Sequence, residues 1–151
     1  MLEGARTAEA ALTMMFGRLR MRLADPDVDL AYRPDDTWSR YGSLIKHICY
    51  TTQGYVAVRM GGLEVALPPS EEHWSADGLV RESLERLVDE TAALCHRALE
   101  GMTAEAWEEE VELYGRRLRR GDLPLFAALH GSQHIGQMLL MDRVRKTAAV
   151  R

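Results

Sequence analysis

Three histidines are the residues of this chain most able to do chemistry. His130 and His134 are spaced i,i+4 in an apolar helical run, and His47 lies upstream in a second such run. An i,i+4 pair shares one helix face with Cβ atoms roughly 5–6 Å apart, so both imidazoles can hold one metal ion at about 2.0–2.1 Å. A third imidazole from a facing helix gives a three-nitrogen site with open coordination positions, as catalytic metals require. The spacing therefore predicts a divalent-metal site with these three ligands.

A structural role is the alternative interpretation of the same residues. A single histidine on an apolar helix face is usually a core residue whose ring finds a hydrogen bond. Here three histidines fall on predicted core faces, and each unpaired buried polar group costs about 1–3 kcal/mol. One shared ion satisfies three ring nitrogens at once, which favours the metal. A catalytically silent bundle dimer with structural histidines stays as the alternative function.

The residues between the histidines of the last run narrow the chemistry. The segment reads His-Gly-Ser-Gln-His from His130 to His134, without the glutamate that acts as general base in His-Glu-x-x-His peptidases. The chain also lacks the paired Glu-x-x-His motifs of a di-iron bundle. A site for a single ion remains, and a metal-dependent hydrolase of another type stays open as a second alternative.

Four further side chains are candidates for substrate binding. Gln137 lies three residues after His134, on the same side of the helix, where it can orient a ligand or a bound water. Tyr41 and Tyr50 share the helical run of His47, and Trp38 precedes that run. We expect these polar and aromatic groups to contribute to the pocket of a small-molecule substrate.

A cysteine close to the first histidine raises the question of a fourth ligand. Cys49 follows His47 by two residues, which is about 200° around a helix. We therefore expect its thiol to face away from the ion, which leaves the site open. Cys49 and Cys95 are also too few for a disulfide framework.

The bulk properties of the chain describe an ordinary globular protein. It has 151 residues, a net charge of −4 and 46% hydrophobic residues, which suits one domain over residues 1–151. The acidic balance argues against direct nucleic-acid binding, because phosphate contacts need clustered Lys and Arg. No signal-peptide layout opens the chain, and no apolar stretch approaches the roughly 20 residues of a bilayer span. We expect a cytoplasmic protein with neither nucleic acid nor membrane as a partner.

Apolar residues recur every three or four positions in four segments, which predicts four amphipathic helices. These helices position most of the candidate residues. Residues 103–121 indicate instead a short helical turn at Thr103 and a hairpin-like excursion around Tyr114-Gly115. The economical arrangement is an all-α four-helix bundle with long connections, which can supply the mouth of a site. The expected helices span about 7–23, about 41–59, a third that Ser75 or Asp77 caps and Gly101 ends, and 123 to about 146.

The first of these helices also indicates self-association. It carries Ala11, Met14 and Phe16 away from its main apolar face. A second apolar face on a bundle helix is a reasonable seam between two copies of a chain. We therefore expect a homodimer.

The histidine pattern resembles that of the DinB/YfiT-like superfamily of metal-dependent proteins. The segment from Tyr41 to Ile48 resembles the family's second-helix pattern, and His-Gly-Ser-Gln-His-Ile-Gly-Gln from His130 resembles the region of the other two ligands. The resemblance implies a DinB-like four-helix bundle, often dimeric, with zinc, nickel or iron on three histidines. It also implies a transferase or isomerase that uses a low-molecular-weight thiol on a small molecule.

Overall fold

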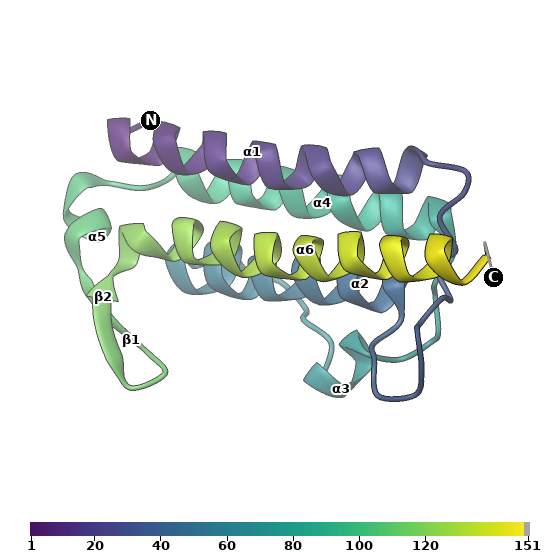
Figure 1. The fold of residues 1–151 in the computed structure, drawn as a ribbon. Helices are drawn as coiled ribbons and strands as arrows, with labels where there is room; N and C mark the ends of the chain where they lie inside the picture. The colour runs from purple at the N-terminus through teal and green to yellow at the C-terminus, as the bar shows by residue number, and fades with distance from the viewer. Residues whose placement is uncertain (150–151) are drawn as a thin grey trace.

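Four long helices form the frame of the protein, and a computed structural model describes residues 1–149 of it (Figure 1). The fold is all-α apart from one two-stranded sheet, as the sequence predicts. Residues 150–151 of the expected domain lie outside the described residues. The long helices are α1 (Glu3–Ala24), α2 (Tyr41–Thr52), α4 (Arg81–Glu100) and α6 (Leu123–Ala149).

The bundle places α2 beside α6, although they lie far apart in the chain. The helices run along one common axis (Figure 1). Helix α1 contacts α4 and α6, and α2 contacts the same two helices, so α1 and α2 lie diagonally across the core. The apolar face of α1 is buried in the core, with Ala8, Leu12, Met15, Leu19 and Leu23 spaced three or four residues apart along it.

The expected dimer seam on α1 needs one correction. Phe16 is only 2% exposed and belongs to the core, so its assignment to the seam is wrong. The reason is that α1 packs between two helices, α4 and α6, and buries a wider face than one stripe. Met14, by contrast, is 65% exposed.

Helix α2 continues without interruption as a π-helical segment, η1 (Gln53–Met60). The sequence predicts one helix to about residue 59, and the chain indeed stays helical to that point, but with a wider turn. A π-helix bonds each N–H one residue further back than an α-helix does, and such segments are frequent at functional sites. The change of turn occurs six residues after His47.

The connection from η1 to α4 does not begin the next helix where the sequence predicts. Helix α4 begins at Arg81, and its N-cap Val80 makes no side-chain cap hydrogen bond, so caps at Ser75 or Asp77 are wrong. Both residues bind Lys46 instead: its Nζ lies 3.0 Å from the Ser75 hydroxyl and 2.9 Å from the Asp77 carbonyl oxygen. This connection also contains an unpredicted short helix, α3 (Ser70–His73), which Lys46 thus helps to tie to α2.

The connection before α6 matches the prediction closely. Thr103 caps α5 (Ala104–Glu108) by accepting a hydrogen bond from the Ala106 N–H. Strands β1 (Glu110–Leu113) and β2 (Arg116–Arg119) then pair antiparallel. The turn between them has φ of 52° at Tyr114 and 73° at Gly115, as a two-residue hairpin of right-handed twist requires. A 3-10 turn, η2 (Arg120–Asp122), leads into α6.

The outer faces of α1 and α6 leave large apolar side chains in solvent. Met21 of α1 and Leu139 of α6 line one shallow hollow between the two helices. None of the helices in residues 1–149 is both long and apolar enough to span a membrane. We call the outer faces of these two helices together the α1/α6 face; the exposed large apolar residues of the two helices are Met14 and Met21 on α1, and Leu125, Leu129, Leu139, Leu140 and Val144 on α6.

Candidate metal centre

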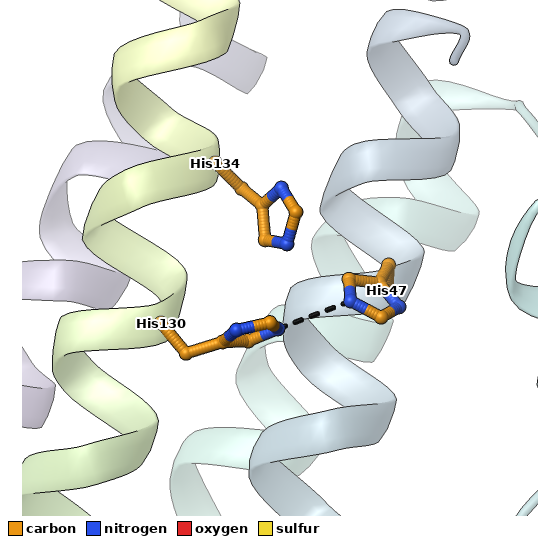
Figure 2. A group of neighbouring side chains, drawn as sticks. All are labelled: His47, His130 and His134. Atoms are coloured by element: carbon orange, nitrogen blue, oxygen red, sulfur yellow. Dashed lines mark hydrogen bonds between the residues drawn. The ribbon is translucent and has the colours of Figure 1, made fainter.

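Helices α2 and α6 direct three histidine side chains toward one point. His47 comes from α2, and His130 and His134 come from consecutive turns of α6 (Figure 2). One ring nitrogen from each lies within 4.8 Å of the others, and all three residues are half-buried. We call them the histidine triad. The structure therefore brings together all three residues that the sequence predicts as metal ligands.

The spacing of the triad suits a shared ion. The Nε2 atoms of His47 and His130 lie 3.0 Å apart. Two nitrogens held at about 2.0–2.1 Å from one ion at a tetrahedral angle lie roughly 3.3 Å apart, so a small adjustment admits the ion. Without an ion, one of the two nitrogens must carry a proton and donate a hydrogen bond to the other. Imidazole donors suit zinc, nickel and iron alike.

The surroundings keep the rings of His47 and His130 neutral, which is the form that binds a metal. Burial, with His134 and His130 close by, lowers the pKa of His47 to about 3. Burial and the nearby His134 also lower the pKa of His130. Both rings therefore offer a nitrogen lone pair at neutral pH.

Gln137 contacts a triad residue, on the side that its spacing predicts. The Nδ1–H of His134 donates to the Gln137 side-chain oxygen at 2.8 Å. With the proton on Nδ1, the Nε2 lone pair of His134 is free for an ion. Partners of this type fix the tautomer and the orientation of a metal-binding histidine.

Two residues that the sequence analysis did not identify lie against His47. The Trp74 ring stacks on the His47 imidazole, with centroids 4.2 Å apart and planes 26° from parallel. The Nδ1 of His73 lies 3.4 Å from the Nδ1 of His47. His73 is the last residue of α3 and Trp74 follows it, in the connection between η1 and α4, which has no helical periodicity in the sequence. The one sequence feature that could have identified these two residues is that a histidine and a tryptophan stand next to each other in a connection that contains proline.

Of the expected pocket residues, Tyr41 is not brought to the triad, and Trp38 packs against the hydrophobic core. Trp38 is partly buried against the core, and the indole that covers His47 is that of Trp74. Tyr41 is buried, and its hydroxyl lies 3.4 Å from a carboxylate oxygen of Asp142. Asp142 is eight residues beyond His134, which is about 12 Å along α6, so Tyr41 is not brought to the triad.

Tyr50, the remaining expected pocket residue, lies beside the centre. Its ring centroid is 5.1 Å from that of His73. Both residues line a groove of about 510 Å³ between η1, the α3 connection and the β1–β2 hairpin. The hydroxyls of Tyr55 and Tyr114, 2.6 Å apart, link η1 to the hairpin at this groove. A small molecule bound there would lie one side chain away from His47.

The family of the chain follows from its sequence as a whole. A sequence model of the DinB superfamily matches residues 6–138. The chain belongs to the DinB superfamily. The matched part of this DinB-superfamily protein contains the histidine triad and Gln137, which confirms the resemblance inferred from the histidine pattern. Among curated proteins, none matches the chain.

Proposed function

We propose that this DinB-superfamily protein is a metal-dependent transferase or isomerase that acts with a low-molecular-weight thiol on a small molecule. Its divalent ion, which we take to be zinc, nickel or iron, would be held by His47, His130 and His134. The observation that carries the proposal is the convergence of three half-buried imidazoles, of which at least His47 and His130 are kept neutral.

A bound ion of this type lowers the pKa of a coordinated thiol or water and creates a nucleophile at neutral pH. The protein's own contribution is to hold the ligands and receive the substrate. Gln137 orients His134 through the 2.8 Å hydrogen bond. Burial raises the pKa of Tyr50, so its hydroxyl stays protonated and is available to donate to a substrate oxygen at the edge of the groove.

The donor set favours thiol transfer over hydrolysis. Within residues 1–149, the cluster suited to hold an ion consists of histidines alone. A metal hydrolase commonly uses a neighbouring carboxylate as general base, as in the His-Glu-x-x-His peptidases. A reaction whose nucleophile arrives as a thiol substrate needs no such base beside the ion.

The surroundings of Cys49 support an open site. Three histidines leave at least one tetrahedral position for a substrate, whereas structural zinc is usually closed by a fourth protein ligand. Cys49 is fully buried and its thiol contacts Thr91 of α4, away from the triad. Burial also raises the pKa of this thiol to about 12, so it stays protonated and does not ligate.

Metal analysis tests the first half of the proposal. Tag-free protein should contain close to one divalent ion per chain, and His134→Ala should abolish its retention. His96→Ala is the matched control, because His96 lies on α4 and pairs with Glu9. Full metal retention in a variant with all three triad histidines replaced by alanine would contradict the proposal and favour the silent bundle.

Cobalt substitution tests the second half. Added thiol should change the visible spectrum of the Co²⁺ protein, because a thiolate entering the open position alters the ligand field. Cys49→Ser should bind Co²⁺ as the wild type does and respond to thiol in the same way. A spectrum that ignores thiol, together with metal loss in Cys49→Ser, would identify a closed structural site and exclude the proposed chemistry.

A further inference from the structure

His47 has a histidine neighbour at each of its two ring nitrogens. Its Nε2 faces the Nε2 of His130 at 3.0 Å, and its Nδ1 faces the Nδ1 of His73 at 3.4 Å. A neutral imidazole carries one proton, so only one nitrogen offers a lone pair. Which nitrogen that is decides whether His47 can bind an ion together with the other triad residues.

The proton on His73 is assigned from its two neighbours, His47 and the Pro68 backbone. The Pro68 backbone acts to raise the pKa of His73 against the lowering by burial, as a carbonyl oxygen beside a ring N–H does. Proline has no N–H, so Pro68 can only accept through its carbonyl oxygen and His73 must donate. Because the Nδ1 of His73 faces His47, we assign the donor to Nε2. The Nδ1 lone pair of neutral His73 is then directed at His47.

We propose that His73 is a positioning residue for the metal centre. By accepting from the Nδ1–H of His47, it holds His47 in the tautomer whose Nε2 lone pair faces His130. This inference rests on the proposed metal function and adds a residue to it. His73 does for His47 what Gln137 does for His134, through a partner on a different element. Metal-binding histidines usually donate their second N–H to such an acceptor.

The α3 segment is built to keep His73 in place. His73 is 9% exposed and lies against the Tyr50 ring. On the other side of His73 in the chain, the Ser75 carbonyl oxygen accepts from the Ser43 hydroxyl at 3.1 Å. Lys46 binds the Ser75 hydroxyl as well. Two residues that precede His47 on α2 thus anchor the segment that carries His73.

A chelator-competition titration with Zn²⁺ tests the role on the whole chain. His73→Leu removes the acceptor and should weaken binding about 10- to 100-fold, the usual effect of losing such a partner. His73→Gln keeps an acceptor for His47 and a donor for Pro68, and should bind within a few-fold of the wild type. His96→Gln, on α4, should bind as the wild type does. Equal loss in the Leu and Gln variants, or no loss in either, would overturn the proposal.

The tautomer itself is read in the metal-free protein by ¹⁵N NMR of the histidine rings. The wild type should carry the His47 proton on Nδ1, and His73→Leu should shift part of it to Nε2. A wild-type proton on Nε2 would overturn the role of His73, even if metal binds normally. Conversely, a chain that shows the expected tautomer but binds no metal would contradict the proposed function alone. The wild-type spectrum alone shows which nitrogen of His47 carries the proton, so the role of His73 is tested even if His73→Leu fails to fold.

Discussion

Single residues of the triad differ in what occupies their second ring nitrogen. His134 donates to Gln137 and His47 faces His73. The Gln137 contact is made between two α6 residues three positions apart, so it depends little on the rest of the fold. Its loss should therefore affect metal binding more than folding.

Replacing Gln137 by alanine tests this separation. Zn²⁺ affinity should fall about tenfold or more, because His134 loses the acceptor that fixes its tautomer. The melting temperature of the metal-free protein should change little, since Gln137 is exposed. Gln133→Ala, an exposed glutamine on the same helix, is the matched control for chelator competition. Equal affinities in the two variants would contradict the prediction.

The pH dependence of stability reports on His47. Its pKa is about 3 in the folded chain against about 6.5 when unfolded. Below pH 6.5, His47 binds a proton in the unfolded chain but not in the folded chain. The metal-free protein should therefore lose stability as pH falls from about 6.5 toward 3. His47→Gln should lose less melting temperature than the wild type between pH 7 and pH 5. Parallel curves for the two proteins would refute this.

Among the elements, η1 depends on close packing at its end. An added Cβ at Gly61 would lie 2.5 Å from the Cβ and 3.0 Å from the Cα of Ala98 on α4. Gly61→Ala should therefore destabilise the protein by about 1–3 kcal/mol through overpacking. Gly17→Ala, inside α1 with open space around it, should instead stabilise by about 0.5–1 kcal/mol. Urea denaturation of both variants measures the change in the free energy of unfolding, which should have opposite signs in the two.

The elements also show what the sequence can and cannot predict. The four long helices follow from apolar periodicity, and the hairpin follows from the local turn chemistry of Tyr114-Gly115. The α-to-π change at Gln53 leaves no mark in that periodicity. Ser75 and Asp77 have the right chemistry for a cap, but in the tertiary structure Lys46 binds the Ser75 hydroxyl and the Asp77 backbone carbonyl, and the helix begins only at Arg81.

The candidate site divides in the same way. The triad and Gln137 were predictable because helical spacing places them on common faces. His73 and Trp74 were not, because their positions depend on how a connection of irregular backbone folds back over α2. For the same reason Trp38 and Trp74 cannot be distinguished as covers of the site from their sequence positions alone.

At the scale of the whole molecule, the α1/α6 face favours a homodimer. Met21 and Leu129 are 69% and 68% exposed on it, and apolar patches of this type mark interaction surfaces. Light scattering at micromolar concentration should give about twice the 17.0 kDa chain mass, because burying these side chains against a second copy removes them from water.

Charge substitutions on the same face test that dimer. Met21→Lys with Leu129→Glu should give the monomer mass, because a dimer would bury both charges. Leu67→Glu, an exposed leucine of the connection after η1, should stay dimeric. A wild-type chain that scatters as a 17.0 kDa monomer would rule out the α1/α6 face as a dimer seam.

The two sides of the triad are separated by 83 residues of chain, although they lie 3.0 Å apart in space. During synthesis, His47 emerges long before α6 exists, so the complete site forms only after the last helix has docked against α2. Loading of the proposed metal would then be a late event in maturation. An ion bound to the complete site would join α2 to the last helix, α6. At a free ion concentration 100 times the dissociation constant, binding would add about 2.7 kcal/mol to the free energy of unfolding. The same centre would then stabilise the folded bundle by bridging two of its helices.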